Sequence, residues 1–434
     1  MASKSWWIFL AVIGPLVGFS FIQSVRTYGE ASGVGGTSAG VGEAFSPLVG
    51  IWAPTFSACE LAAAFLLPFV AIRLVAGDRQ TGALKIELQH PMPAAARISA
   101  KAVVLAAGWV IASAAPALAI VLWKLYGGSL YPPELATVAL GHFVNAGLTI
   151  ALGSAAAAIT EHPSTAAIAA LTVTVGTWIV NFIAAVQGGF WERLAAYTPT
   201  AMVAGFQQGL IRLDVVLIAV ALIVSGLALS AIWLRLGVSE GRRVAESFGV
   251  AAALWVAIFA CAFATASWDT SENRMNSFSP GDEHALRQIH DPLRIEAHLA
   301  PEDPRRVDLE HRALSKLRRI MPRLQVEYVS ATSIGLFEQT SAHYGEIWYE
   351  LGGRRAMSRT TTAEGVLEAI YSVADTRAAA GNRSADGSNR PVPDDDIFRG
   401  HPLAVQPKGA GAIFYIIWPS VVVAAAFLVR RRHS

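Results

Sequence analysis

The sequence predicts a mainly α-helical, polytopic membrane protein with about eight transmembrane helices and one small extracytoplasmic α/β domain. Three observations carry this prediction. Apolar residues make up 53% of the 434 residues and charged residues only 15%, a balance that soluble domains rarely show. Several apolar runs reach the roughly 20 residues that a helix needs to cross a bilayer. One section, Asp282–Asp375, has frequent charges and short apolar runs instead.

Each apolar run should form one helix, because backbone groups find no water partners in lipid. The runs are approximately Trp6–Val25, Ile51–Val75, Ala102–Leu122, Leu135–Ile159, Ala166–Val186, Val215–Leu236, Phe248–Ala266 and Ile413–Val429. The first run follows Lys4, is longer than the apolar region of a signal peptide and precedes no A-x-A cleavage site. We therefore expect an uncleaved anchor.

Lysine and arginine predict the orientation of the spans, because these residues gather in cytoplasmic loops. A path with eight spans places every basic cluster on one side, namely Lys4, Arg73, Arg79, Lys85, Arg97, Lys101, Arg235, Arg242, Arg243 and Arg430–Arg432. We therefore expect both termini in the cytoplasm. The opposite side receives the Gly-rich loop Tyr28–Glu43, the stretch Phe190–Leu213 and everything from Trp268 to about Gly409.

The charged section shows the patterns of a small α/β domain. Strands are predicted at Leu293–Leu299 and Leu324–Val329, with a helix over Asp308–Met321 between them. Glu346–Leu351 and Arg355–Ser358, separated by Gly352–Gly353, predict a hairpin. Thr361 and Glu364 have the spacing of a capping box at the start of a last helix. The predicted order is β-α-β-β-β-α.

These patterns divide the chain into five parts. They are a six-span domain over 1–237, a seventh helix with its cytoplasmic lead-in over 238–267, an extracytoplasmic α/β domain over 268–375, a flexible linker over 376–410, and a last span with a basic tail over 411–434. The linker assignment rests on Gly, Ser, Asn, Asp and Pro that follow no periodicity.

A short polar segment, Gly77–His90, lies between the second and third spans. Gln80, Leu84 and Leu88 fall at helical spacing. Leu84, Ile86 and Leu88 also alternate with polar residues, as in a strand, so the pattern leaves the conformation open. A segment in this place can be a surface that a partner grips at the membrane or an ordinary solvated loop.

Around this segment the sequence resembles the motif of ABC-2 type exporter permeases. In that motif a span runs through Pro-x-x-Ala-x-Arg into an acidic-Arg-x-x-Gly turn and then a short coupling helix that ends at Pro. The matching residues are Pro68, Ala71, Arg73, Asp78, Arg79, Gly82 and Pro91. The family usually has Glu, Thr and Glu where this chain has Asp78, Ala83 and Lys85. The resemblance implies that a cytosolic ABC ATPase contacts Asp78, Arg79, Gly82, Leu84, Leu88 and Pro91.

The charged section resembles the first part of the auxiliary domain of gliding-motility-type ABC transport systems. The residues that carry this resemblance are Phe278-Ser279, Leu293–Leu299 with Pro301–Pro304, Glu327-Tyr328-x-Ser330, Tyr344-Gly345-x-Ile347 and Ser358–Thr361 with Glu364. In that family the domain is usually longer and sits on a second polypeptide. This chain thus resembles a permease fused to a shortened auxiliary domain.

Together the resemblances imply the permease subunit of an ABC export system in a bacterial inner membrane, working as a homodimer or permease pair. No Walker A sequence occurs, so ATP is expected on a separate ATPase chain. For this chain we expect no cofactor, no enzymatic activity and no nucleic-acid partner. An alternative class is a membrane-anchored interaction protein that relays force to a protein partner without solute transport. An intramembrane enzyme is a third class, which lacks paired polar groups here.

Glu60 is a carboxylate inside an apolar run. Such groups are costly in lipid and usually face the interior of a helix bundle. Glu60 could line a translocation path together with His142 and Asn145, or it could make an interhelical hydrogen bond that only holds the bundle together. The sequence leaves both readings open.

Two clusters in the soluble domain carry weaker hypotheses. The histidines His284, His290, His298 and His311 match no metal-ligand spacing. A basic patch could receive an anionic partner or be a solvated helix face; it comprises Arg305, Arg306, Arg312, Lys316, Arg318, Arg319 and Arg323. The two cysteines, Cys59 and Cys261, form no CxxC pair.

Overall fold

Among the residues that the computed structural model describes, eight helices are long and apolar enough to cross a membrane, as the hydropathy of the sequence predicts. They cover Lys4–Glu30, Leu48–Gly77, Ala94–Leu125, Pro132–Ile159, Pro163–Ala184, Leu213–Trp233, Glu240–Cys261 and Ala410–Arg431. The structure describes residues 4–33, 46–80, 92–187, 190–235, 237–272, 274–300, 303–329, 343–374 and 407–431. The prediction of a mainly α-helical protein is confirmed.

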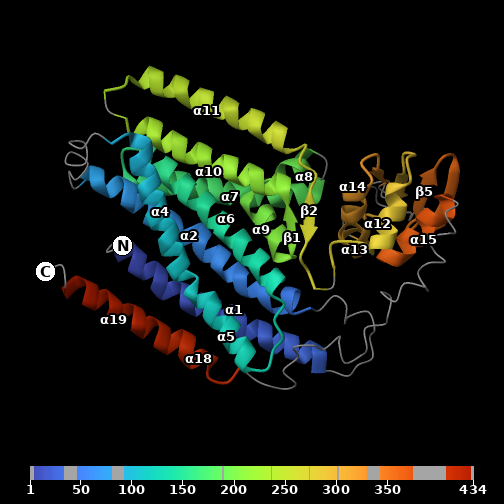
Figure 1. Cartoon of the computed structure of the whole chain (residues 1–434), viewed down its shortest axis with the longest axis horizontal. Helices are drawn as coiled ribbons and strands as arrows, with labels where there is room; N and C mark the ends of the chain where they lie inside the picture. The colour runs from blue at the N-terminus through green and yellow to red at the C-terminus, as the bar shows by residue number, and fades with distance from the viewer. Residues whose placement is uncertain are drawn as a thin grey trace, which may run out of the picture. The chain divides into compact units, whose positions relative to one another are not determined.

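The chain divides into two units (Figure 1). The first comprises Met1–Ser271 with Ile397–Ser434, and the second comprises Glu272–Asp396. The long helices of the first unit are α1 (Lys4–Gly33), α2 (Ala53–Gln80), α4 (Ala94–Ala112), α5 (Ala114–Leu125), α6 (Pro132–Ile159), α7 (Pro163–Gln187), α10 (Leu213–Trp233), α11 (Glu240–Cys261) and α19 (Trp418–Arg431). Its short elements are π-helical turns at Leu48–Trp52 and Ile413–Ile417, α8 (Phe190–Ala195), α9 (Pro199–Gln207), α18 (Ala410–Ala412), and the strands β1 (Leu210–Arg212) and β2 (Ser267–Asp269).

Proline sets several helix boundaries. The helices α6, α7 and α9 each begin at a proline, which lacks only an N–H that would be unpaired at that position anyway. Within the third span, α4 ends at Ala112 and α5 begins at Ala114. Pro116 explains this break, because it has no N–H for the Ala112 carbonyl and its ring crowds that carbonyl.

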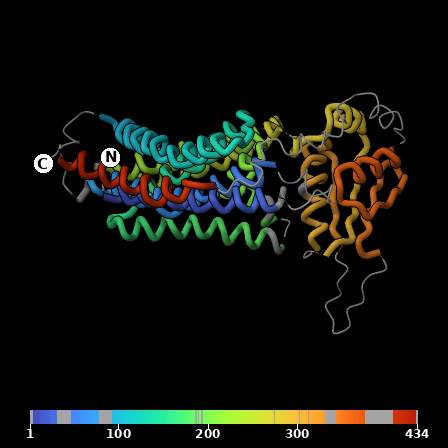
Figure 2. Tube along the Cα trace, turned by 90° about the horizontal axis from the view of Figure 1, so that it is seen from below, coloured from blue at the N-terminus to red at the C-terminus, as the bar shows by residue number. Residues whose placement is uncertain are grey.

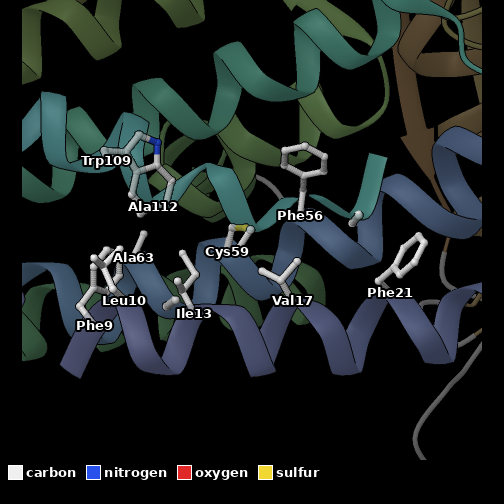
Figure 3. Packing of buried hydrophobic residues seen from close by; sticks show 14 of the residues in the cluster. Phe9, Leu10, Ile13, Val17, Phe21, Phe56, Cys59, Ala63, Trp109 and Ala112 are labelled. Carbon is white, nitrogen blue, oxygen red and sulfur yellow. The ribbon is translucent and has the colours of Figure 1, made fainter. Parts of the chain in front are cut away.

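The core of the first unit lies between α1 and its neighbours. Figure 3 shows a row of α1 side chains, including Phe9, Ile13 and Phe21, that faces α2 and α4. Gly14 and Gly18 of α1 leave room for the last span. A Cβ on Gly14 would lie 2.1 Å from Trp418, and one on Gly18 would lie 2.3 Å from Phe414. Small residues thus let the first and last spans pack closely, and Trp418 Nε1 donates to the Leu10 carbonyl at 2.7 Å.

The helices α2 and α6 also approach closely at a glycine. A Cβ on Gly153 of α6 would lie 3.1 Å from the Ala71 Cβ and 3.3 Å from the Pro68 Cα. Pro68 and Ala71 belong to the permease-like motif, so this part of the motif serves helix packing here.

The start of α1 and the end of α19 lie at the same end of the helix bundle, as Figures 1 and 2 show. The turn between α10 and α11 is at this end too (Figure 1). It is held by Glu246, which pairs with Arg235 at 2.7 Å and Arg242 at 3.1 Å. Arg235 and Arg242 of this turn and Arg430 and Arg431 in the last turn of α19 therefore place basic residues where the two chain ends lie.

The second unit is a four-stranded sheet with helices packed on it. Its elements are α12 (Pro280–Arg287), β3 (Arg294–Ala297), α13 (Pro304–Leu309), a π-helical turn at Glu310–Leu314, α14 (Ser315–Ile320), β4 (Gln325–Tyr328), β5 (Ile347–Leu351), β6 (Arg354–Ser358) and α15 (Ala363–Ala374). The strand order is β4-β3-β5-β6; β3 is parallel to β4, whereas β5 is antiparallel to both β3 and β6. The predicted order of strands and helices matches these elements, and α12 is an addition.

Alternation along the strands builds the core of this unit. Ile295 and Ala297 of β3 and Ile347, Tyr349 and Leu351 of β5 are buried with the apolar sides of the helices. The predicted hairpin joins β5 to β6 through Gly352 and Gly353, whose φ angles are 56° and 81°. Positive φ at both positions favours the glycines that the sequence places there.

The cap of α15 differs from the predicted one. The helix begins at Ala363, and the Thr362 hydroxyl accepts a hydrogen bond from Gly365 N at 3.3 Å. The predicted capping box of Thr361 and Glu364 is therefore wrong by one residue. With Thr362 as the cap, the third helical position is Gly365, which has no side chain to reach back.

Candidate functional site

Polar side chains from three helices meet inside the apolar bundle of the first unit. Ser57 and Glu60 lie one turn apart on α2, His142 lies on α6, and Gln207 is the last residue of α9. We call these four residues the polar cluster. Glu60 is half-buried, and His142 is only 3% exposed. The structure thus places both Glu60 and His142, which the sequence analysis assigned to one possible translocation path, around Gln207.

Gln207 connects the other members of the polar cluster. Its Nε2 donates to Ser57 Oγ at 3.2 Å and lies 3.3 Å from His142 Nε2. The carboxyl group of Glu60 lies beside the same amide group. An amide nitrogen only donates, so in this orientation of the Gln207 amide His142 Nε2 is the acceptor.

His142 is held in a mostly apolar setting. The ring of Phe56 lies 5.2 Å from its ring, measured between centroids. His142 Nδ1 is buried and has no hydrogen-bond partner among the described residues. Asn145, one turn further along α6, is also buried, and its carbonyl accepts from Thr149 Oγ1 at 2.9 Å. The predicted path residues on α6 therefore share one buried face.

The sequence analysis missed Ser57 and Gln207. Ser57 lies three residues before Glu60, so a search one turn around the intramembrane carboxylate would have found it. Gln207 lies in the stretch Phe190–Leu213, which forms α8, α9 and β1. Nothing in the sequence indicates that the end of α9 reaches a carboxylate on α2.

The predicted ATPase-coupling residues fall at and beyond the end of α2. The backbone of Asp78 and Arg79 belongs to the last turn of α2, which ends at Gln80. Gly82, Leu84, Leu88 and Pro91 lie outside the described residues, so the conformation of the coupling segment stays a prediction. The chain resumes at Met92 and enters α4 at Ala94.

A two-stranded ribbon links α9 and α10 to the chain that leads into the second unit. Strand β1 pairs antiparallel with β2, with Ile211 opposite Trp268. The carbonyl of Gly209 accepts from both the N–H and the hydroxyl of Thr270, each at 2.8 Å. Thr270 Oγ1 also lies 2.7 Å from Thr137 Oγ1 of α6. The ribbon therefore begins three residues after Gln207 of the polar cluster.

Each side chain of the basic patch has a partner within the second unit. Arg305 pairs with Asp303 at 2.7 Å, and the Tyr344 hydroxyl donates to the same carboxylate at 2.7 Å. These donors, Arg305 above all, hold the pKa of Asp303 well below its usual range. The other members contact Tyr328 (Arg306), Asp308 (Arg312), the Ser277 carbonyl (Lys316), Glu310 (Arg318), the Asn276 carbonyl (Arg319) and the His290 carbonyl (Arg323). A solvated, internally paired helix face describes the patch better than a free anion site.

The predicted histidines lie apart from one another. His284 contacts Gln288, His298 contacts Glu296, and the side chain of His311 lies outside the described part. No group of three or more possible metal ligands lies together in the described ranges. A histidine that the sequence analysis missed, His343, lies 2.9 Å from Glu346, which Arg359 also contacts at 3.0 Å. His343 and then Arg359 lower the pKa of Glu346.

Comparison with known proteins finds no family model, no curated protein and no solved structure that matches this chain. The resemblances to the ABC families therefore remain predictions from short motifs.

Proposed function

We propose that this chain is the membrane subunit of an ATP-driven exporter of the ABC type. It works as a homodimer or permease pair in a bacterial inner membrane, with both termini in the cytoplasm. Energy comes from a separate cytosolic ATPase, because the sequence contains no Walker A motif. The second unit then lies outside the membrane.

One observation carries this proposal: α2 is a single helix from Ala53 to Gln80. It holds Ser57 and Glu60 of the polar cluster and ends where the predicted coupling segment begins. At 1.5 Å per residue, the distance from Glu60 to Gln80 is about 30 Å. A push on the coupling segment would therefore act along one helix on the polar cluster.

The packing of α2 supports such transmission. Gly153 of α6 lies so close to Pro68 and Ala71 that a Cβ on it would be 3.3 Å from the Pro68 Cα and 3.1 Å from the Ala71 Cβ, so α2 and α6 have little freedom to slide independently. His142 lies on α6, and Glu60 lies on α2. Closure of an ATPase dimer would tilt the two helices against α9, which holds Gln207, and would open or close the polar cluster.

The coupling segment supplies the test. Leu84→Asp combined with Leu88→Asp should abolish binding of the ATPase, because charges buried in an apolar contact cost several kcal/mol. The measurement is ATP hydrolysis that co-purifies with the tagged protein from native membranes in detergent. Gln89→Asp is the matched control, since it adds a charge to the same segment at a polar position. Undiminished hydrolysis with the double variant would contradict the coupling assignment.

A second candidate function rests on the β1–β2 ribbon. The hydrogen bonds of Thr270 to Gly209 and Thr137 fasten the lead-in of the second unit to α6 and α9. Movement of these helices could then be relayed to a protein partner of the second unit without any solute crossing. ATP hydrolysis stimulated by a protein partner, with no stimulation by solutes, would favour this force-relay function over export.

A further inference from the structure

The amide nitrogen of Gln207 faces more acceptors than it can serve. Ser57 Oγ lies at 3.2 Å and His142 Nε2 at 3.3 Å from this nitrogen, so these two acceptors use both of its hydrogens, while the carboxyl group of Glu60 lies beside the same amide. An amide nitrogen carries two hydrogens, whereas an ammonium nitrogen carries three. The three acceptors therefore suit an ammonium group better than they suit the amide that fills the place.

The negative charge of Glu60 also favours an ammonium group at this place. No Lys, Arg or His forms an ion pair with Glu60 among the described residues. A carboxylate at membrane depth is costly unless a positive charge or a proton neutralises it. Gln207 is neutral and cannot do this. An ammonium group in its place would satisfy the three acceptors and neutralise Glu60 at once.

The polar cluster is open on one side. Ser57 is exposed, and Leu61, one turn along α2, is 43% exposed. The opposite side is closed by His142 and Phe56, which are 3% and 5% exposed. A ligand can therefore reach Ser57 and Glu60 along an apolar face of α2, and the imidazole forms the back of the site.

We propose that the polar cluster binds the primary ammonium group of an amphipathic molecule, with its apolar part along α2. The ammonium displaces the Gln207 amide and donates to Glu60, Ser57 and His142. Naming this molecule as the cargo rests on the proposed export function, whereas the binding site itself does not. A quaternary ammonium, which has no N–H, should bind poorly because it leaves Ser57 and His142 without a donor.

The test is thermal unfolding of the purified full-length protein in detergent, with n-octylammonium as the probe. Octyltrimethylammonium and n-octanol are controls that keep the chain length but lack N–H donors or charge. We expect octylammonium alone to raise the Tm with saturation. Equal shifts with all three probes would mean nonspecific partitioning and would overturn the proposal.

Two variants test whether octylammonium binds at the polar cluster. Glu60→Gln should weaken the octylammonium response about tenfold or more, because the amide removes the countercharge. Glu134→Gln is the matched control, since Glu134 is a buried carboxylate elsewhere on α6, and it should respond like the wild type. An unchanged response of Glu60→Gln would place the probe elsewhere and refute the site.

A tethered ammonium gives an independent measurement. Gln207→Lys should raise the Tm without ligand and abolish the response to octylammonium. Gln207→Met should leave the Tm without ligand no higher than that of the wild type and should keep the response to octylammonium. A Tm that rises only as the pH falls, with no response to octylammonium, would show that Glu60 takes a proton instead. The unfolding assay contains no ATPase, so a negative result in it says nothing about the coupling segment. Likewise, a negative result in the test with Leu84→Asp and Leu88→Asp says nothing about the ammonium site.

Discussion

Single side chains cap the N-termini of four helices in this protein. Thr198, Ser279 and Asp303 each accept a hydrogen bond from a backbone N–H in the first turn of α9, α12 and α13. Thr362 does the same for α15. The first N–H groups of a helix have no partner within the helix, so a side-chain oxygen there stabilises it. At α15 this effect can be measured against a neighbouring threonine.

Thr362→Ala should lower the free energy of unfolding of the second unit by about 1 kcal/mol, because Gly365 N loses its acceptor. Thr361→Ala is the control and should cost less than half of that. The measurement is urea unfolding of a fragment that spans residues 272–375 and contains the whole buried core of this unit. Equal losses in both variants would contradict the observed cap, and a fragment without cooperative unfolding would contradict an independent core.

Among the elements, the β1–β2 ribbon depends on one glycine. Gly209 has a φ of 76°, and a Cβ there would lie 3.1 Å from Ser271 N. Any other residue is strained in this conformation and would also push against Ser271, just after β2. Gly209 therefore permits the turn from α9 into β1 and the close approach of Thr270.

Gly209→Val should loosen the ribbon. Cysteines at Ile211 and Trp268, which lie opposite each other in the two strands, should form a disulfide readily in the parent chain. We expect the yield of this crosslink to fall several-fold with Gly209→Val. Gly205→Ala is the matched control, since a Cβ there would meet its nearest neighbour, the Leu210 carbonyl oxygen, at 3.8 Å. Equal yields would show that Gly209 does not hold the ribbon.

Across the whole molecule, charge is distributed by side. The start of α1, the end of α19 and the α10–α11 turn lie at one end of the bundle (Figure 1), and the last turn of α19 and the α10–α11 turn carry basic residues. Positively charged segments stay in the cytoplasm during insertion. Both termini should therefore be cytoplasmic, and the second unit should be outside.

Thiol labelling in intact cells checks this topology. A cysteine at Ser384 should react with a membrane-impermeant reagent, whereas one at Ser434 should react only after the cells are permeabilised. Cys59 is buried and Cys261 half-buried, so the parent chain serves as the background control. Labelling of Ser434→Cys alone in intact cells would reverse the orientation.

Local chemistry made much of the fold predictable. Lipid imposes its requirement on each segment separately, so hydropathy alone located the eight candidate spans. In the second unit, alternation in Leu293–Leu299 and the Gly352–Gly353 pair indicated a strand and a hairpin, because strand faces and positive φ are properties of neighbouring residues. These features do not depend on what the rest of the chain does.

Contacts between distant segments were settled only by tertiary packing. Gln207 bonds Ser57 across 150 residues, and Trp418 bonds the Leu10 carbonyl across 408; no local pattern marks either pair. Glu60 was recognisable as an unusual carboxylate, but its partners depend on where α9 ends, and that position results from the packing of α9 on α6.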